Sequence, residues 1–277
     1  MIEAASLVCG YGRNDVLRDI HFRVRPGEFI GILGPNGTGK STFLLTLGGV
    51  LPYRQGSIRI SGEEIAGTSQ GWRAKRIGSV QQRTEISFPF KCLSVVLMGR
   101  YPYISRWGGY SLSDREAALQ AMEDTGTIHL AERMITEVSG GEAQRVIIAR
   151  ALAQQTDLLF LDEATSSLDV SAKIRIFDLL RRKNGSGTTI LCAMHDLNLA
   201  ALYCRRLLFL KDRSIVLDGS TEETFKDETL SRIYETDVRV CRHPVTNDPQ
   251  ALFVPGAHHG PGSAYGGAAA SGCGPGR

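Results

Sequence analysis

The residues with the clearest chemical meaning form a glycine-rich segment: Gly34, Pro35, Asn36, Gly37, Thr38, Gly39, Lys40, Ser41 and Thr42. An apolar run at 29–33 precedes the segment, and another at 43–47 follows it. A strand, a glycine loop and a helix in that order are the setting of a phosphate-binding loop, in which backbone N–H groups converge on an anion. We expect Lys40 to reach the outer phosphates of a nucleotide and the Ser41 hydroxyl to bind Mg²⁺. The alternative, an ordinary turn before a helix, is disfavoured by the flanking pattern.

Two carboxylates at the end of another apolar run indicate the rest of a nucleotide site. Residues 158–161 are apolar, and Asp162 and Glu163 follow them directly. The carboxyl end of a buried parallel strand is where ligands bind in α/β proteins. Asp162 suits the Mg²⁺ shell, directly or through water, and Glu163 can polarise an attacking water beside the γ-phosphate. A polar strand end that only caps the next turn is the alternative, and a phosphate loop in the same chain makes it less attractive.

The order of strands and helices favours an α/β fold. Apolar runs predict strands at 2–8, 20–24, 29–33, 57–60, 77–80, 158–161 and 189–194, with a hairpin at 207–210 and 214–217. Helices are expected after the glycine loop, from Ser113, from Ser139, over 172–182 and, as two short pieces, over 222–234. Ser113 and Ser139 each precede a glutamate by three residues, which is the spacing of a capping box. The alternation implies a mainly parallel sheet with crossover helices.

The composition excludes several classes of protein. A chain of 277 residues, 42% hydrophobic and 22% charged, can bury a large core. Its net charge of +3 gives no electrostatic reason to expect nucleic acid as a partner. The six cysteines show no paired spacing, so we expect free thiols in a reducing compartment. The N-terminus does not read as a signal peptide and no apolar run reaches the ~20 residues of a membrane helix, so we expect any membrane role to come through a partner.

Taken together, the motifs resemble those of the nucleotide-binding subunits of ABC transporters. That family combines a phosphate loop, an S-G-G-[QE] stretch in a helical insert and an Asp-Glu strand end, which stand here at 34–42, 139–142 and 162–163. The resemblance covers about residues 2–254. It implies a P-loop NTPase core with a mainly parallel sheet, an N-terminal antiparallel β subdomain and an α-helical subdomain inserted at about 84–155. The Gly- and Ala-rich segment 256–277 is expected to form a flexible tail.

The resemblance assigns roles to residues outside these three motifs. Tyr11 is similar to the aromatic residue that stacks on adenine, with a core tyrosine as the alternative. Gln81 is similar to the glutamine that contacts Mg²⁺ and the attacking water, and the adjacent Gln82 remains an alternative for that role. His195 resembles the histidine that bonds the γ-phosphate and orders the water of Glu163.

Further positions imply that the site is shared between two chains. Ser139, Gly140 and Gly141 resemble the signature that clamps the γ-phosphate bound to the opposite subunit, although Ser139 and Glu142 could equally form a plain capping box. Asp169 resembles the aspartate that crosses to the phosphate loop of the partner. Because the chain has one copy of each motif, the resemblance implies a head-to-tail homodimer that holds two ATP molecules between its chains.

Two positions depart from the family pattern. Ala164 stands where the family usually has proline, and Val138 stands where the signature usually begins with leucine. The first change makes the turn after Glu163 less rigid and the second keeps an apolar side chain. Neither removes a catalytic group, so ATP hydrolysis is still expected.

The resemblance also implies partners and a cargo. It implies membrane permease subunits, an associated substrate-binding protein and a peripheral position on the cytoplasmic face of the cell (inner) membrane. Apolar residues near Phe88, Pro89 and Phe90 and at Val95 are candidates for the permease contact, with packing inside the subunit as the alternative. Segments 95–102, 194–198 and 239–245 are similar to those of importers of iron-siderophore, haem and cobalamin, so ATP-driven import of a metal chelate is expected.

Three other functions compete with metal-chelate import. An ATPase for another small solute or metal ion would carry the same motifs. A soluble ABC ATPase acting on DNA or ribosomes would be expected to have coiled-coil inserts or a second cassette, and the sequence has neither. A regulatory nucleotide-binding module without turnover is disfavoured by the presence of Glu163 and His195.

Overall fold

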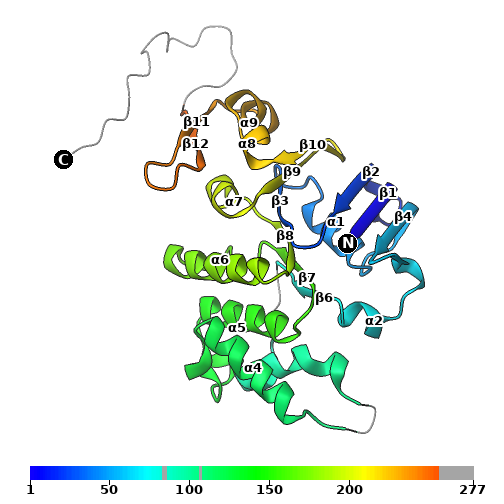
Figure 1. The fold of residues 1–277 in the computed structure, drawn as a ribbon, viewed down its shortest axis with the longest axis vertical. Coiled ribbons are helices and arrows are strands. Elements are labelled where there is room, and N and C mark those ends of the chain that lie inside the picture. The colour runs from blue at the N-terminus through cyan, green and yellow to red at the C-terminus, as the bar shows by residue number, and fades with distance from the viewer. Residues whose placement is uncertain (83–85, 106–107, 256–277) are drawn as a thin grey trace, which may run out of the picture.

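The centre of the fold is a six-stranded sheet built from distant parts of the sequence. A computed structural model describes residues 1–82, 86–105 and 108–255. The strands lie in the order β10 (Ser214–Ser220), β9 (Arg206–Lys211), β3 (Phe29–Leu33), β8 (Thr189–Ala193), β7 (Leu158–Asp162) and β6 (Ile77–Val80). Neighbouring strands are parallel except β10 and β9, which confirms the predicted α/β fold. The carboxyl ends of β3, β8, β7 and β6 therefore share one edge of the sheet (Figure 1).

Both faces of this sheet are buried, and side chains alternate between them. In β7, Leu158 and Phe160 join the core that contains helix α1 (Lys40–Leu47). Leu159 and Leu161 join the core that contains α6 (Val170–Gly185) and α7 (Leu197–Tyr203). Strands β3, β8 and β9 alternate in the same way, and Figure 1 shows α6 and α7 on the side opposite α1. Because the period of a strand is two, Asp162 has the orientation of Phe160 and faces α1.

An antiparallel sheet covers the other side of α1. Its strands lie in the order β2 (Asn14–Val24), β1 (Ile2–Tyr11), β4 (Tyr53–Ile60) and β5 (Glu63–Glu64). The rings of Phe22 and Phe43 meet edge to face, with centroids 5.3 Å apart. This confirms the expected N-terminal antiparallel sheet, although β1, β2 and β4 extend beyond the predicted runs. Register shifts after Ala4 and Leu7 interrupt the apolar alternation of β1, which explains why the sequence pattern ended early.

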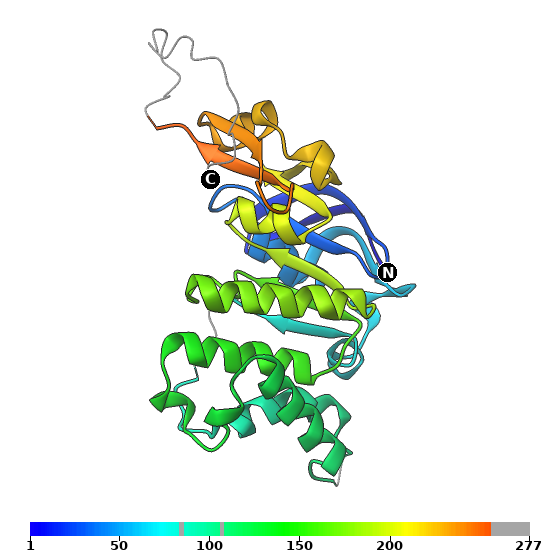
Figure 2. The same ribbon diagram turned by 60° about the vertical axis from the view of Figure 1, so that its left-hand side comes forward.

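A helical layer is inserted between β6 and β7, as expected. It contains α3 (Cys92–Leu97), η2 (Met98–Tyr103), α4 (Leu112–Asp124), η3 (Ile128–Leu130), η4 (Ile135–Glu137) and α5 (Gly140–Ala153). Helix α5 packs against α3 and α4, and Figure 2 shows it running alongside α6. Val95 is fully buried in this layer, so its predicted role in a permease contact is wrong.

Helix α4 begins earlier than the sequence pattern predicted. Its capping box consists of Ser111 and Asp114, not of Ser113 and Glu116. Ser111 Oγ accepts from Asp114 N at 3.2 Å, and Asp114 Oδ2 accepts from Ser111 N at 2.9 Å. The shorter acidic side chain takes the place of the usual glutamate in the capping box.

Asp114 also pairs with Arg100, which is buried in the helical layer. Arg100 Nε donates to Asp114 Oδ1 at 2.9 Å, and its Nη1 donates to the Ala153 carbonyl oxygen at 3.0 Å. The two charged side chains are only 11% and 8% exposed. Gly99 permits this close approach, because a Cβ there would lie 2.1 Å from the Arg150 carbonyl oxygen. The Gly99-Arg100 pair therefore joins η2 to α4 and α5.

The remaining elements are short and lie mainly at the C-terminal end. They are η1 (Ile65–Gly67), α2 (Gln70–Ala74), α8 (Thr221–Thr224), α9 (Asp227–Tyr234), β11 (Val238–Arg242) and β12 (Pro249–Phe253). The two short helices were predicted, but the β11–β12 hairpin was not. It packs on α7, where Asn198 Oδ1 accepts from Ala251 N at 2.7 Å. The predicted tail at 256–277 lies outside the described residues. In the part of the chain that the structure describes, no helix has the length and apolar character needed to cross a membrane.

Replacing Arg100 by alanine should destabilise the protein strongly. The change leaves Asp114 buried without its cation, so we expect the free energy of unfolding to fall by about 3 kcal/mol or more. Urea unfolding followed by circular dichroism measures this loss. As a control, Arg59→Ala removes an exposed pair with Glu64 at 3.7 Å, for which at most about 1 kcal/mol is expected. Equal losses in both variants would contradict the structural role of Arg100.

The pair also predicts how stability depends on pH. Hydrogen bonds from Ser111 and Arg100 lower the pKa of Asp114 from 3.8 to about 2. A depressed carboxyl pKa stabilises the fold above the unfolded-state pKa, and this stability is lost as the pH falls through the folded-state pKa. Asp114→Asn should therefore be less stable than the parent at neutral pH, and the difference should shrink as the pH falls from about 4 to about 2. Urea midpoints across this range measure the effect, and a difference independent of pH would contradict it.

Candidate functional site

The glycine loop between β3 and α1 has the geometry of an anion site. Gly34, Gly37 and Gly39 all have positive φ angles, of 140°, 78° and 100°. A Cβ at Gly34 would lie 2.1 Å from the Leu210 carbonyl oxygen, so only glycine fits there. The loop thus confirms the predicted strand, turn and helix, and its curled backbone leads directly into the N-terminus of α1.

Lys40 lies inside this loop. Its ammonium donates to the carbonyl oxygens of Gly34 at 2.9 Å and Pro35 at 3.1 Å, and the residue is only 5% exposed. Burial lowers the pKa of Lys40, while the nearby Glu163 and Asp162 raise it. A cation held at the centre of an anion-binding loop is arranged to contact phosphate.

Asp162 is buried at the end of β7, on the α1 side of the sheet. It is 8% exposed, and its Oδ1 has no hydrogen-bond partner among the described residues. Burial raises the pKa of Asp162, and a hydrogen bond from Ser41 and the charge of Lys40 oppose that shift. A buried carboxylate oxygen without a partner beside a serine hydroxyl fits a hard divalent cation such as Mg²⁺.

Glu163 begins the turn that follows β7, and two side chains from other elements contact its carboxylate. His195, at the end of β8, donates through Nε2 to Glu163 Oε1. Gln82, after β6, donates through Nε2 to Glu163 Oε2 at 2.7 Å. The structure therefore brings the predicted Glu163 and His195 together at the shared strand edge.

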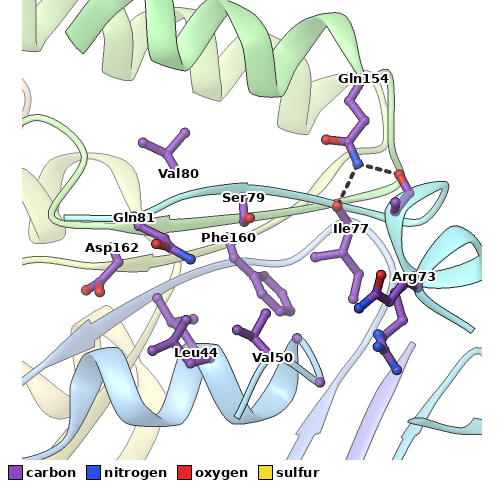
Figure 3. A pocket seen from close by; sticks show the side chains of 15 residues that line it. Leu44, Val50, Arg73, Ile77, Ser79, Val80, Gln81, Gln154, Phe160 and Asp162 are labelled. Atoms are coloured by element: carbon purple, nitrogen blue, oxygen red, sulfur yellow. Dashed lines mark hydrogen bonds between the residues drawn. The ribbon is translucent and has the colours of Figure 1, made fainter. Parts of the chain in front are cut away.

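Gln81 points to a different part of the site from Gln82. It lines a pocket of about 440 Å³ together with residues of α1, α2, β6 and β7, Asp162 among them. Figure 3 shows Gln81 next to Asp162 at one end of this pocket, with Arg73 and Ile77 at the other. Gln81 therefore lies on the Asp162 side of the site and Gln82 on the Glu163 side, so both remain candidates for the catalytic glutamine.

Tyr11 ends β1 at the edge of the antiparallel sheet. The residue is 52% exposed, which excludes the alternative of a core tyrosine. The hairpin formed by β1 and β2 packs on α1, whose N-terminus continues from the glycine loop. An exposed aromatic ring on this hairpin is available to stack on a base.

The residues expected to complete the site from another chain lie apart from the glycine loop. Ser139 is the N-cap of α5 and forms a full capping box with Glu142. Helix α5 packs in the helical layer, whereas α1 packs against β1, β7 and β8 (Figure 1). Asp169 is the N-cap of α6, where its Oδ1 accepts from Ala172 N at 2.8 Å. Ser139, Gly140 and Asp169 are all exposed, as a surface that meets another chain requires.

One residue near the catalytic turn was missed by the sequence interpretation. Gln144 on α5 donates to the Ala164 carbonyl oxygen at 2.7 Å. The sequence did contain a signal for it: Gln144 is a polar side chain just ahead of the buried apolar stretch that starts at Val146. A polar side chain that is partly buried requires a hydrogen-bond partner.

Comparison with known proteins identifies the family. The sequence matches the family model described as ABC transporter over residues 17–166. The hemin import ATP-binding protein of Hahella chejuensis is 37% identical over 260 residues, which cover 91% of this chain and 100% of that protein. The chain belongs to the ABC transporter family. Another relative of this ABC chain, the ferric enterobactin transport ATP-binding protein of Escherichia coli K12, is 34% identical and covers 95% of this chain and 97% of its own.

Solved structures agree with this ABC assignment. A metal-chelate type ABC transporter in an inward-facing conformation has a TM-score of 0.78 and 27% identity, over 91% of this chain and 96% of that one. A dimeric ATP-binding cassette in a post-hydrolysis state with ADP and Pi has a TM-score of 0.73 and 27% identity. The match covers 80% of this chain and 99% of that chain. The chain is therefore an ABC ATPase subunit that binds ATP and whose hydrolysis of ATP is coupled to transport.

Lys40→Ala should weaken nucleotide binding. The variant removes the buried cation from the centre of the loop, so we expect the affinity for a fluorescent ATP analogue to fall roughly tenfold or more. A fluorescence titration measures the dissociation constant. Lys91→Ala is the control, because Lys91 is exposed and pairs with Glu132 at 2.7 Å. Unchanged affinity in Lys40→Ala would contradict the assigned role of the lysine.

Proposed function

We propose that this ABC ATPase powers the import of a metal chelate, of the iron-siderophore, haem or cobalamin type, through a membrane permease. The observation that carries the proposal is similarity along nearly the whole chain to a hemin and a ferric enterobactin import subunit. The same region aligns with a metal-chelate type transporter of known structure. The motifs for ATP binding are common to many cargoes, so full-length similarity carries more weight than the motifs alone.

The catalytic residues act from one edge of the central sheet. Lys40 and the N–H groups of the glycine loop hold the phosphates, and Ser41 and Asp162 would hold Mg²⁺, which would neutralise charge on the phosphates. Glu163 orients and polarises the attacking water. His195 fixes the Glu163 carboxylate and reaches the γ-phosphate. Gln81 contacts the metal side of the site, where it lies beside Asp162.

The working enzyme is a head-to-tail homodimer. In this arrangement Ser139, Gly140 and Gly141 of one chain close over the ATP held by Lys40 of the other, and Asp169 crosses to the partner's glycine loop. The exposed N-terminus of α5 supports this, because Ser139 and Gly140 lie on the surface at the positive end of the helix dipole, where an anion is favoured. Tyr11 stacks on the adenine.

The pocket beside Gln81 is the docking groove for a helix of the permease. Leu44, Val50 and Phe160 give it an apolar floor, and Gln81 links it to Asp162 (Figure 3). Phe88 and Phe90, which are 71% and 42% exposed, lie in the segment that follows Gln81 and supply further apolar contact. The permease would hold the subunit at the cytoplasmic face of the cell (inner) membrane, and a substrate-binding protein would deliver the cargo. Reconstitution with the permease and a panel of chelates tests the cargo, and uptake of a non-chelate solute alone would overturn it.

Glu163→Gln should separate ATP binding from turnover. The amide keeps the shape of the side chain but cannot act as a base, so we expect ATP affinity to persist and phosphate release to fall at least about a hundredfold. The variant should accumulate as an ATP-bound dimer, which size-exclusion chromatography with and without ATP measures. Near-normal phosphate release would remove Glu163 from its assigned role.

A further inference from the structure

The turn that carries Glu163 has an unusual backbone. Glu163 has φ of 49°, in the left-handed region that residues with a Cβ seldom adopt. Two backbone hydrogen bonds hold it there: Glu163 N donates to the Ala193 carbonyl oxygen at 2.9 Å, and Ser166 N donates to the Glu163 carbonyl oxygen at 3.0 Å. The direction of the carboxylate therefore depends on how this turn is held.

The next residue gives the turn little rigidity of its own. Ala164 has no ring to fix its φ angle, so hydrogen bonds and packing must set the orientation of the peptide groups around it. It is 2% exposed, which places its carbonyl group in the protein interior. The partner of that carbonyl oxygen is the side-chain amide of Gln144, at 2.7 Å.

Gln144 comes from a different layer of the fold. It lies on α5, twenty residues before Ala164 in the sequence, and it is half-buried. The first turn of α5 lies against the same loop, since a Cβ at Gly141 would be 3.8 Å from Leu168 Cδ2 and from the Ser167 carbonyl oxygen. The start of α5 and the catalytic turn are thus in direct contact over two successive helical turns.

We propose that Gln144 is a positioning residue for Glu163. By holding the Ala164 carbonyl oxygen, it fixes the left-handed turn and hence the direction of the Glu163 carboxylate toward the attacking water. This rests on the proposed role of Glu163 as the residue that polarises that water.

Three substitutions at Gln144 separate the hydrogen bond from the packing. Gln144→Met keeps the volume without a donor, Gln144→Glu keeps the shape without a donor, and Gln144→Lys supplies a donor again. We expect kcat for ATP hydrolysis to fall about tenfold in the first two variants, because small displacements of a catalytic group cost rate steeply. The KM for ATP should change little, and the melting temperature should fall by only a few degrees, because the buried carbonyl oxygen loses its donor. Gln144→Lys should recover most of the rate.

The control variant is Gln120→Met, which changes an exposed glutamine on α4 whose side chain donates to Asp124 at 3.1 Å. It should leave kcat unchanged. If Gln144→Met has normal kcat per folded molecule, or if only its melting temperature falls, the bond merely joins α5 to the turn and the proposal is overturned.

A second measurement separates this proposal from the role of Glu163. In the Glu163→Gln background, Gln144→Met should leave the ATP-induced dimer intact, because the signature surface is unchanged. A weaker dimer would mean that Gln144 shapes that surface, and would overturn positioning of the carboxylate. Near-normal phosphate release by the Glu163→Gln single variant would instead contradict the proposed role of Glu163. The two failures can therefore be told apart by which measurement changes.

Discussion

Burial of the central sheet on both faces is the constraint on which the rest of the structure depends. In β3, β7 and β8 both the odd and the even positions are apolar and buried, so polar side chains are confined to the strand ends. Because these strands are parallel, their carboxyl ends meet at one edge. That edge collects the glycine loop, Asp162, Glu163, His195 and the two glutamines after β6. Residues separated by more than a hundred positions in the sequence become neighbours without any long-range motif.

In the proposed mechanism the site is incomplete within one chain. The edge supplies the cation of Lys40, the buried carboxylate of Asp162 and the proposed base Glu163, but the helix end at Ser139 lies in the helical layer. The proposed homodimer would bring that helix end of another copy over the nucleotide. Closure of this dimer would move the groove beside Gln81 and the permease helix bound in it. This movement would couple ATP hydrolysis to transport.

Much of this was predictable from the sequence, and the failures have physical causes. The glycine loop and the 158–163 strand end were predicted because their chemistry is local, and the Ser139 capping box because its spacing is fixed. The start of α4 was placed at Ser113 because a glutamate was assumed in the capping box, whereas Asp114 forms it with Ser111. The β11–β12 hairpin was missed because Arg239, Arg242 and Gln250 interrupt its short apolar runs and its burial depends on α7. Gln144 and the buried Arg100 could not be assigned, since no local spacing reveals their partners. Gln144 bonds a backbone carbonyl group, and Arg100 bonds both the Asp114 carboxylate and a backbone carbonyl group.

The central claim is that each ATP site is built from two chains, and mixing two inactive variants tests it most directly. Lys40→Ala disables the glycine loop, and Gly140→Asp places a carboxylate where the signature should meet the γ-phosphate, so each homodimer should be inactive. In a mixed dimer, one site combines the intact Lys40 of one chain with the intact signature of the other. Because about half of the dimers in an equal mixture are mixed and each has one complete site, about a quarter of the parent ATPase rate should return. If the mixture stays as inactive as its components while the two chains still form mixed dimers, the composite site is contradicted.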